Sequence, residues 1–188
     1  MAHIESSEIE GSVLAMVWAE GPLTPYAIRK DFLNSPNPQW SGSAGTIYPL
    51  IARLRRRGWI RSEVRLRGKR KGNYISLTAT GLRALRRWLC APLAEWVVGV
   101  PPDPLRTRVR FLGVLSSREQ REFLRAAQRG TREHLKLVEN DWRYSYSPRT
   151  KLRKLQARGA LLSMQARCAY VREVAKALGI PVRPARES

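Results

Sequence analysis

The sequence of 188 residues has few cysteines and no long hydrophobic run. Its two cysteines, Cys90 and Cys168, are far apart, unlike the closely spaced cysteines of a metal site. We therefore expect two buried thiols in a reducing compartment rather than a disulfide. The apolar run at residues 13–19 is too short for a signal peptide or a membrane span, and the first ten residues, MAHIESSEIE, are acidic. These absences predict a soluble, cytoplasmic protein that makes no membrane contact.

The sequence also lacks the residue patterns of most enzymes. His3 and His134 are isolated, and Glu133 is not flanked by the pair of histidines that a zinc protease requires. A glycine-rich phosphate loop, a nucleophile elbow and a close pair of carboxylates in an apolar setting are missing. A tyrosine recombinase would need a His-x-x-Arg element, which is absent. We therefore predict no enzymatic activity, no cofactor and no metal site.

Acidic residues are scarce compared with basic ones. The chain has 35 lysines and arginines against 15 aspartates and glutamates, which gives a formal net charge of +20. A field of this sign attracts polyanions, of which nucleic acid is the commonest. The alternative is an arginine-rich codon bias, which would distribute arginine without a function. Composition by itself thus favours DNA or RNA binding.

Two proline-containing segments organise the chain, NSPNP at residues 34–38 and GVPPDP at residues 99–104. The second one separates residues 1–98 from residues 99–188. Periodic apolar residues predict helices in both parts. We therefore expect two domains, an N-terminal one of mixed structure and a C-terminal one that is nearly all helix.

The N-terminal part begins with two short predicted helices. The first ends at the Gly-Pro pair of residues 21–22, where the helical spacing of apolar residues stops. The second begins at Pro25 with Thr24 as its N-cap, because proline is tolerated at the first helical position. It has to end before Pro36.

The stretch SGSAGTIYPLIARLRRRGWI, residues 41–60, predicts a third helix. Its inward-facing residues, at helical spacing, are Ile47, Leu50, Ile51 and Leu54. Gly58 ends the helix as a residue with left-handed backbone, and the preceding arginines complement the helix dipole. Pro49 removes a backbone donor, so elementary chemistry predicts a distorted first turn or a helix start nearer Thr46.

After Gly58 the apolar period changes to two, which predicts a β-hairpin. Its tip is the basic run RGKRKG at residues 67–72, and its second strand is a short one at residues 74–77. Thr78 then caps a fourth helix, whose leucines Leu82, Leu85 and Leu89 are expected to face inward. Three helices, a basic hairpin and a helix are the elements of a winged helix-turn-helix domain. The fold class is therefore mostly α with a small β-hairpin.

In such a domain the third helix enters a DNA groove and the hairpin contacts the backbone beside it. Small hydroxyl side chains at the helix start allow close approach, and arginines and lysines reach phosphates. The candidates for DNA contact are Ser41, Ser43, Thr46, Tyr48, Arg53, Arg56, Lys69, Arg70 and Lys71. The alternatives are that Ser43 serves only as a helix cap, that Tyr48 packs in the core and that the two arginines are merely solvated.

Four motifs carry a resemblance to a known family: GPLTPYAI (21–28), GTIYPLIARLRRRGWI (45–60), the basic hairpin tip and NYISLTATG (73–81). With them, the N-terminal part resembles the PadR family of bacterial transcriptional regulators. The resemblance implies a homodimeric repressor with a C-terminal helical dimerisation region, often released from DNA by a small molecule. It also implies that the third helix continues through Pro49. The acidic residue usual in the family after Arg-Leu is replaced here by Arg55.

The C-terminal part predicts two long helices, from residue 117 to about 146 and from about 149 to 179. The last helix has two stripes of apolar or small residues. The predicted dimer contacts are Leu161, Met164, Cys168, Val171, Ala175 and Leu178. The second stripe is Leu152, Leu155, Gly159, Leu162, Ala166 and Ala169. One stripe would pack within the subunit and the other against a second copy, and the alternative is a monomeric bundle that buries both.

Trp88, Trp96 and Trp142 are candidates for an effector site, although aromatic residues at such spacings more often form core or dimer contacts. The sequence thus predicts a sequence-specific regulator that binds double-stranded DNA as a homodimer. It would be a repressor of a palindromic operator, with a small-molecule effector. One alternative is a nonspecific architectural nucleic-acid-binding protein, and the other is a protein-interaction adaptor with a winged fold.

Overall fold

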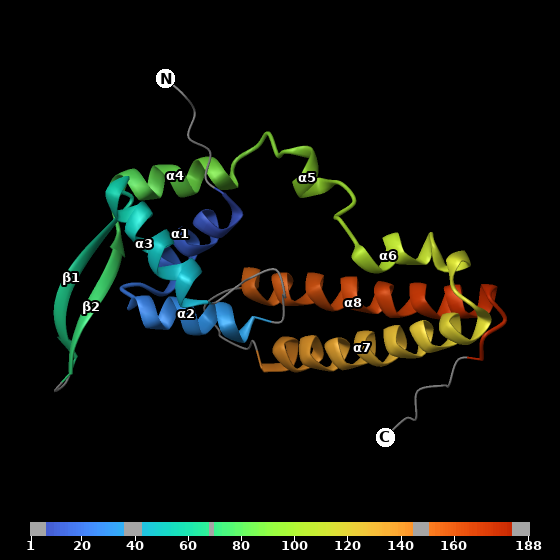
Figure 1. Ribbon diagram of the computed structural model, residues 1–188. Helices are drawn as coiled ribbons and strands as arrows, with labels where there is room; N and C mark the ends of the chain where they lie inside the picture. The colour runs from blue at the N-terminus through green and yellow to red at the C-terminus, as the bar shows by residue number, and fades with distance from the viewer. Residues whose placement is uncertain (1–6, 36–42, 68–69, 145–150, 182–188) are drawn as a thin grey trace. The chain divides into compact units, whose positions relative to one another are not determined.

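A computed structural model describes residues 7–35, 43–67, 70–144 and 151–181 of the chain. It divides the chain into two compact units, residues 1–99 and residues 100–188. Figure 1 shows the mixed helix and hairpin structure of the first unit and the long helices of the second. The predicted fold class, mostly α with one antiparallel hairpin, is confirmed.

The N-terminal unit contains helices α1, α2 and α3, a two-stranded hairpin and helix α4, followed by the short helix α5. Their bounds are α1 Glu8–Glu20, α2 Pro25–Asn34, α3 Ala44–Arg56, β1 Ile60–Arg67, β2 Arg70–Leu77, α4 Ala79–Leu89 and α5 Glu95–Val98. One apolar core holds α1 to α4 and the hairpin together, and its fully buried large side chains include Leu14, Ile28, Phe32, Leu54 and Ile75. Apolar burial at helical spacing is the main force that fixes their packing.

The helix starts follow the capping signals of the sequence. The Thr24 hydroxyl accepts a hydrogen bond from the Ala27 N–H at 3.1 Å, and Pro25 opens α2 as predicted. Thr78 caps α4 in the same way through the Gly81 N–H. At the start of α1, Ser7 and Glu10 each accept a hydrogen bond from the other's backbone N–H, forming a capping box.

Helix α3 runs through Pro49 without a break, so the expected distortion or late start was wrong. In a helix, the missing N–H of Pro49 would have bonded the carbonyl of Gly45. Gly45 is exposed, so water can reach that carbonyl, and a helix beginning at Ala44 has Pro49 early in its second turn. Gly58 has φ of 66° and ends the helix in the left-handed conformation, as predicted.

The hairpin is longer than the sequence suggested. Strand β2 begins at Arg70 rather than at residue 74, and the register pairs Ile60 with Leu77 and Arg67 with Arg70. Ile60 and Ile75 are buried in the core, whereas Val64 and Leu66 are 62% and 76% exposed. The hairpin therefore has one end in the core and extends its other end from the domain, which backbone pairing permits without apolar burial (Figure 1).

Helix α4 packs closely on the start of the hairpin. A Cβ atom on Gly81 would lie 1.9 Å from the carbonyl oxygen of Trp59, so only glycine fits there. Leu85 is buried as predicted and Leu82 is half-buried, but Leu89 is 61% exposed, so its predicted inward position was wrong. At this last turn of α4 it is Trp88, not Leu89, that packs against α1.

The C-terminal unit consists of α6 Pro104–Val109, the 3-10 turn η1 Leu112–Val114, α7 Ser117–Tyr144 and α8 Lys151–Ala177. The two long helices pack side by side, with Leu124, Val171 and Ala175 buried between them. Asp103 caps α6 and forms an ion pair with Arg167 of α8, which ties the start of this unit to its last helix.

The two cysteines are free thiols, as predicted. Cys168 is buried, but Cys90 lies just after α4 and is exposed, so the expectation that both thiols are buried was wrong. None of the helices in the described part of the chain has the length and hydropathy that a membrane crossing needs.

Candidate nucleic-acid interface

The start of α3 presents hydroxyl groups at the surface. Ser43 is the N-cap residue, yet its side chain makes no cap hydrogen bond to the helix backbone. Its Oγ instead lies 2.8 Å from the Thr46 Oγ1. Tyr48 is 45% exposed, so it is not a core residue. The alternatives of simple side-chain capping and core packing therefore do not apply, and Ser41 lies outside the described residues.

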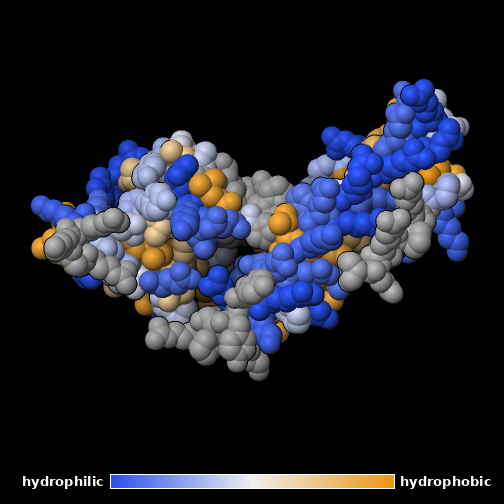
Figure 2. Space-filling model, turned by 90° about the horizontal axis from the view of Figure 1, so that it is seen from below, coloured by the Kyte–Doolittle hydropathy of each residue, from blue (hydrophilic) through white to orange (hydrophobic). Residues whose placement is uncertain are grey.

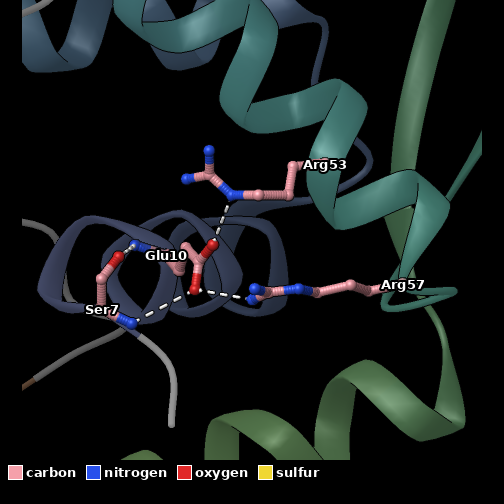
Figure 3. Close-up of polar contacts among 4 residues, drawn as sticks. All are labelled: Ser7, Glu10, Arg53 and Arg57. Atoms are coloured by element: carbon pink, nitrogen blue, oxygen red, sulfur yellow. Dashed lines mark hydrogen bonds and ion pairs between the residues drawn. The ribbon is translucent and has the colours of Figure 1, made fainter. Parts of the chain in front are cut away.

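The arginines at the other end of α3 differ in their surroundings. Arg56 is exposed. Arg53 donates a hydrogen bond from Nε to Oε1 of Glu10 in α1, at 2.8 Å, and Arg57 donates from Nη1 to Oε2 at 2.9 Å. Figure 3 shows the Glu10 carboxylate between the two guanidinium groups, with the terminal nitrogens of Arg53 turned away from it. Arg53 thus has a structural partner in addition to any phosphate contact.

Glu10 is a buried carboxylate, with only 3% of the residue exposed. Burial raises the pKa of this carboxyl group, but the hydrogen bond from Arg53, the backbone N–H of Ser7 and the positive charge of Arg57 outweigh it. The pKa of Glu10 therefore lies below its ordinary value, and the group is charged at neutral pH. Three hydrogen bonds and two positive charges compensate for the loss of water around it.

The same contact reaches the hairpin. The guanidinium carbon of Arg57 lies 5.0 Å from the ring centroid of Trp59, which is buried at the start of the hairpin. Sequence reasoning missed Glu10 and Arg57 as residues that fix this site. The Ser-x-x-Glu spacing at residues 7–10 signals a capping box, but pairing with arginines more than forty residues away has no local signal.

The hairpin has a basic outer part whose charge is partly neutralised. Lys71 is exposed on β2, while Lys69 lies outside the described residues and the side chain of Arg70 is not described. Glu63 pairs with Arg65 at 2.7 Å and with Arg61 at 3.0 Å. The hydrogen bond from Arg65, with the charges of both arginines, lowers the pKa of Glu63.

The predicted effector residues have separate environments. The indole N–H of Trp88 donates to Oε1 of Glu8 at 2.8 Å, and its ring packs on Gly11, where a Cβ would lie 2.3 Å away. Trp96 is 65% exposed on α5, and Trp142 lies under the guanidinium of Arg158. A hollow of about 260 Å³ in the N-terminal unit contains none of the three, and its lining is Met16, Glu20, Leu23, Ala27, Lys30, Asp31 and Asn34.

The stripe predicted to form the dimer is largely buried within the chain. Leu161, Cys168, Val171 and Ala175 are at most 6% exposed, Met164 is half-buried and Leu178 is 43% exposed. This placement corrects the choice of stripe, because a face that packs inside the subunit is not available to a second copy. The other stripe is open, with Leu152, Leu155 and Leu162 between 50% and 75% exposed.

Comparison with known proteins agrees with this architecture. Residues 13–87 match the Transcriptional regulator PadR-like family. No curated protein matches the chain. PadR of Bacillus subtilis in complex with operator DNA is similar in structure, with a TM-score of 0.74 and 20% identity over 92% of this chain and 99% of that one.

Two further solved structures are similar over nearly their whole length. A PadR-like transcriptional regulator from Bacillus cereus has a TM-score of 0.76 and 16% identity, and covers 95% of this chain and 99% of its own. The virulence activator AphA of Vibrio cholerae has a TM-score of 0.70 and 20% identity over 92% and 98%. At such identities these likenesses concern the fold.

The family match begins after Glu10 and covers the hydroxyl groups of Thr46 and Tyr48, the partners Arg53 and Arg57, and the hairpin. This family is one of transcriptional regulators, and the structurally similar Bacillus subtilis PadR is bound to operator DNA. The winged-helix part of this chain, residues 13–87, is therefore similar to the PadR-like family of transcriptional regulators.

Proposed function

We propose that the protein is a dimeric repressor that recognises a palindromic operator through α3 and its hairpin. The observation that carries this proposal is that Ser43 and Tyr48 are exposed and Thr46 is half-buried at the start of α3. Apolar residues of the same helix are buried, so this row of hydroxyl groups is the surface that α3 offers to a partner. Hydroxyl groups can donate to and accept from base edges and phosphates.

In this mechanism α3 lies in the major groove and the hairpin follows the backbone beside it. Base contacts by the hydroxyl groups supply specificity, and Arg56 and Lys71 supply phosphate contacts. If the protein neutralises six phosphates, the logarithm of affinity falls with the logarithm of salt at a slope of about −5.

A dimer would place two such helices in successive major grooves, about 34 Å apart. The open stripe on α8 supports this part of the proposal, because Leu152, Leu155 and Leu162 expose apolar surface on a helix whose opposite face is buried. Apolar surface of this kind is stabilised by contact with a partner. A second copy would bury it.

A competition experiment tests sequence specificity. Genomic fragments that bind the purified protein are mapped, and the shared sequence is then compared with a random duplex of the same length at the same salt concentration. We expect at least a thousandfold tighter binding to the operator. Equal affinity for both duplexes would support the architectural alternative, and no binding to either would support the adaptor.

Release by a small molecule is a separate part of the proposal. One solved structure of Bacillus subtilis PadR, 19% identical to this chain, holds p-coumaric acid. Planar aromatic acids are therefore the first compounds to titrate against the operator complex, with tryptophan fluorescence as a second signal. Operator affinity that stays unchanged with every compound would remove the effector from the proposal, and a reporter gene under the operator distinguishes repression from activation.

A further inference from the structure

The positive charge of this protein is not concentrated in its winged-helix unit. Residues 1–99 carry 15 basic and 7 acidic residues, a formal charge of +8, whereas residues 100–188 carry 20 and 8, a charge of +12. The unit that would be needed only for assembly is thus the more cationic one. DNA contact by α3 and the hairpin does not account for this excess.

Seven of the 20 basic residues of this unit gather on one face of α7, while the five acidic residues of α7 are spread more widely around the helix. At 100° per residue, seven basic side chains of this helix fall within an arc of about 80°. We call them the α7 basic stripe: Arg118, Arg121, Arg125, Arg129, Arg132, Lys136 and Arg143. Six of the seven are exposed and Arg132 is half-buried. The buried residues Leu124, Thr131 and Val138 lie on a different face of α7, so the stripe is turned to solvent.

The stripe is neutralised in part, since Glu139 falls within the same arc and Arg132 has an interaction partner. Arg118 pairs with Glu122 at 3.0 Å. In the part of the chain that the structure describes, no acidic side chain pairs with Arg121, Arg125 or Arg129. Figure 2, which views the molecule from below, shows a largely hydrophilic surface over the long helices. Like charges at successive turns repel one another, so the arrangement is unfavourable for an isolated helix.

The spacing of the stripe suits a polyanion with a regular charge repeat. Arg121, Arg125 and Arg129 follow one another at about 6 Å along the helix axis, and the distance from Arg121 to Lys136 is about 22 Å. One strand of duplex DNA presents a phosphate for every 3.4 Å or so of axis, so this length corresponds to about six phosphates. Guanidinium groups bind phosphate with paired donors.

From these observations we infer that the α7 basic stripe binds the phosphate backbone of DNA, as a second contact surface separate from α3 and the hairpin. A second copy packed stripe against stripe would be repelled by its own charge, and the described part of this cationic chain has no exposed acidic surface that matches the stripe. An anionic membrane would also attract this positive charge. DNA is the better-supported partner, because the winged-helix part is similar to a family of transcriptional regulators. The inference thus rests on the proposed function.

The test uses the full chain and two duplexes. One contains the operator alone, and the other has about 20 base pairs of unrelated sequence added on each side, which is longer than the roughly six phosphates that the stripe would span. The variant replaces Arg121, Arg125 and Arg129 with glutamine. The control variant replaces Arg108, Arg172 and Lys176, which are exposed basic residues of the same unit outside the stripe, and so removes the same charge.

We expect the wild-type protein and the control variant to bind the long duplex about tenfold more tightly than the short one. The stripe variant should lose this advantage and reduce the salt slope on the long duplex by about 2.7, or 0.9 for each lost contact. Its affinity for the short duplex should stay within about twofold of the wild type. Circular dichroism verifies that all three proteins are folded.

A stripe variant that keeps the flank advantage and the salt slope would overturn the inference. The inference would also be overturned if the stripe variant lost binding to phosphatidylserine vesicles but kept wild-type binding to both duplexes, because a membrane would then be the partner of the stripe. If the protein shows no operator specificity, the proposed function fails. In that case the salt slope of the stripe variant is compared with that of the wild type on a random duplex. The same decrease in slope would support DNA binding by the stripe, and an unchanged slope would overturn it.

Discussion

Glu10 of α1 accepts a hydrogen bond of 2.8 Å from Nε of Arg53 in α3, and this contact joins the first helix of the domain to the helix that we place in the DNA groove. The carboxylate is buried, whereas 43% of the arginine side chain is exposed. Arg57 binds the other oxygen of the same carboxylate and stacks on Trp59. Glu10 thereby fixes the angle of α3 and reduces the charge that its end presents.

Replacing Glu10 with glutamine should destabilise the N-terminal unit by about 2 kcal/mol, because hydrogen bonds to charged partners are lost or weakened in a buried position. Urea unfolding followed by circular dichroism measures this loss. Glu122→Gln is the matched control, since its pair with Arg118 is exposed and should contribute less than about 0.5 kcal/mol. Equal losses in the two variants would contradict a structural role for Glu10.

The contribution of Glu10 should also depend on pH. Its pKa is lower in the folded protein than in the unfolded chain, where it is about 4.3. The stabilisation is therefore fully present above the unfolded pKa and is lost as the pH falls through the folded pKa. The difference in unfolding free energy between wild type and Glu10→Gln should be constant from pH 7 to 5.5 and should shrink towards pH 3. A difference that grew on acidification would refute this linkage.

Two glycine-to-alanine changes should have opposite effects on stability. Gly81→Ala forces a Cβ against the Trp59 carbonyl oxygen, so we expect a loss of about 3 kcal/mol. Gly159 is exposed in the middle of α8 with nothing within 4 Å of an added Cβ, so alanine there should stabilise by up to about 1 kcal/mol. Thermal unfolding of both variants measures this contrast. A destabilising Gly159→Ala would indicate that another helix packs on this residue in the dimer.

The open stripe of α8 makes a prediction about assembly. Glutamate at both Leu155 and Leu162 should convert the dimer to a monomer, because a charge at an apolar contact has to be desolvated. Sedimentation equilibrium at micromolar concentration measures the mass. Leu137→Glu is the control, since Leu137 is similarly exposed on α7 but outside the stripe. A wild-type mass equal to one chain would remove the dimer altogether.

The phosphate contacts can be counted by salt titration. Replacing Arg56 and Lys71 with glutamine should reduce the salt slope on the operator by about 2 and weaken binding to operator and random duplex alike. Thr46→Val should leave the slope unchanged and weaken operator binding by about tenfold, because it removes a hydrogen-bonding group and no charge. If the Thr46→Val variant lowered the salt slope and the charge variant weakened only operator binding, the proposed roles in base contact and phosphate contact would be wrong.

Local signals in the sequence determined the order and most boundaries of the elements. Thr24 with Pro25, Thr78 and Gly58 act through their own backbone neighbours, so caps and helix ends could be predicted from a few adjacent residues. The same holds for the buried face of α3, because helical spacing alone brings Ile47, Leu50 and Leu54 to one side.

Tertiary structure decided which surfaces stay open and which charges are paired. Both stripes of α8 are apolar at the same spacing, and only the packing of α7 determines that Leu161 is buried and Leu155 is exposed. The pairing of Glu10 with Arg53 likewise requires α1 and α3 to meet in the core. Periodicity acts over one or two turns of a helix, whereas contacts between distant segments depend on how the faces of separate helices fit together.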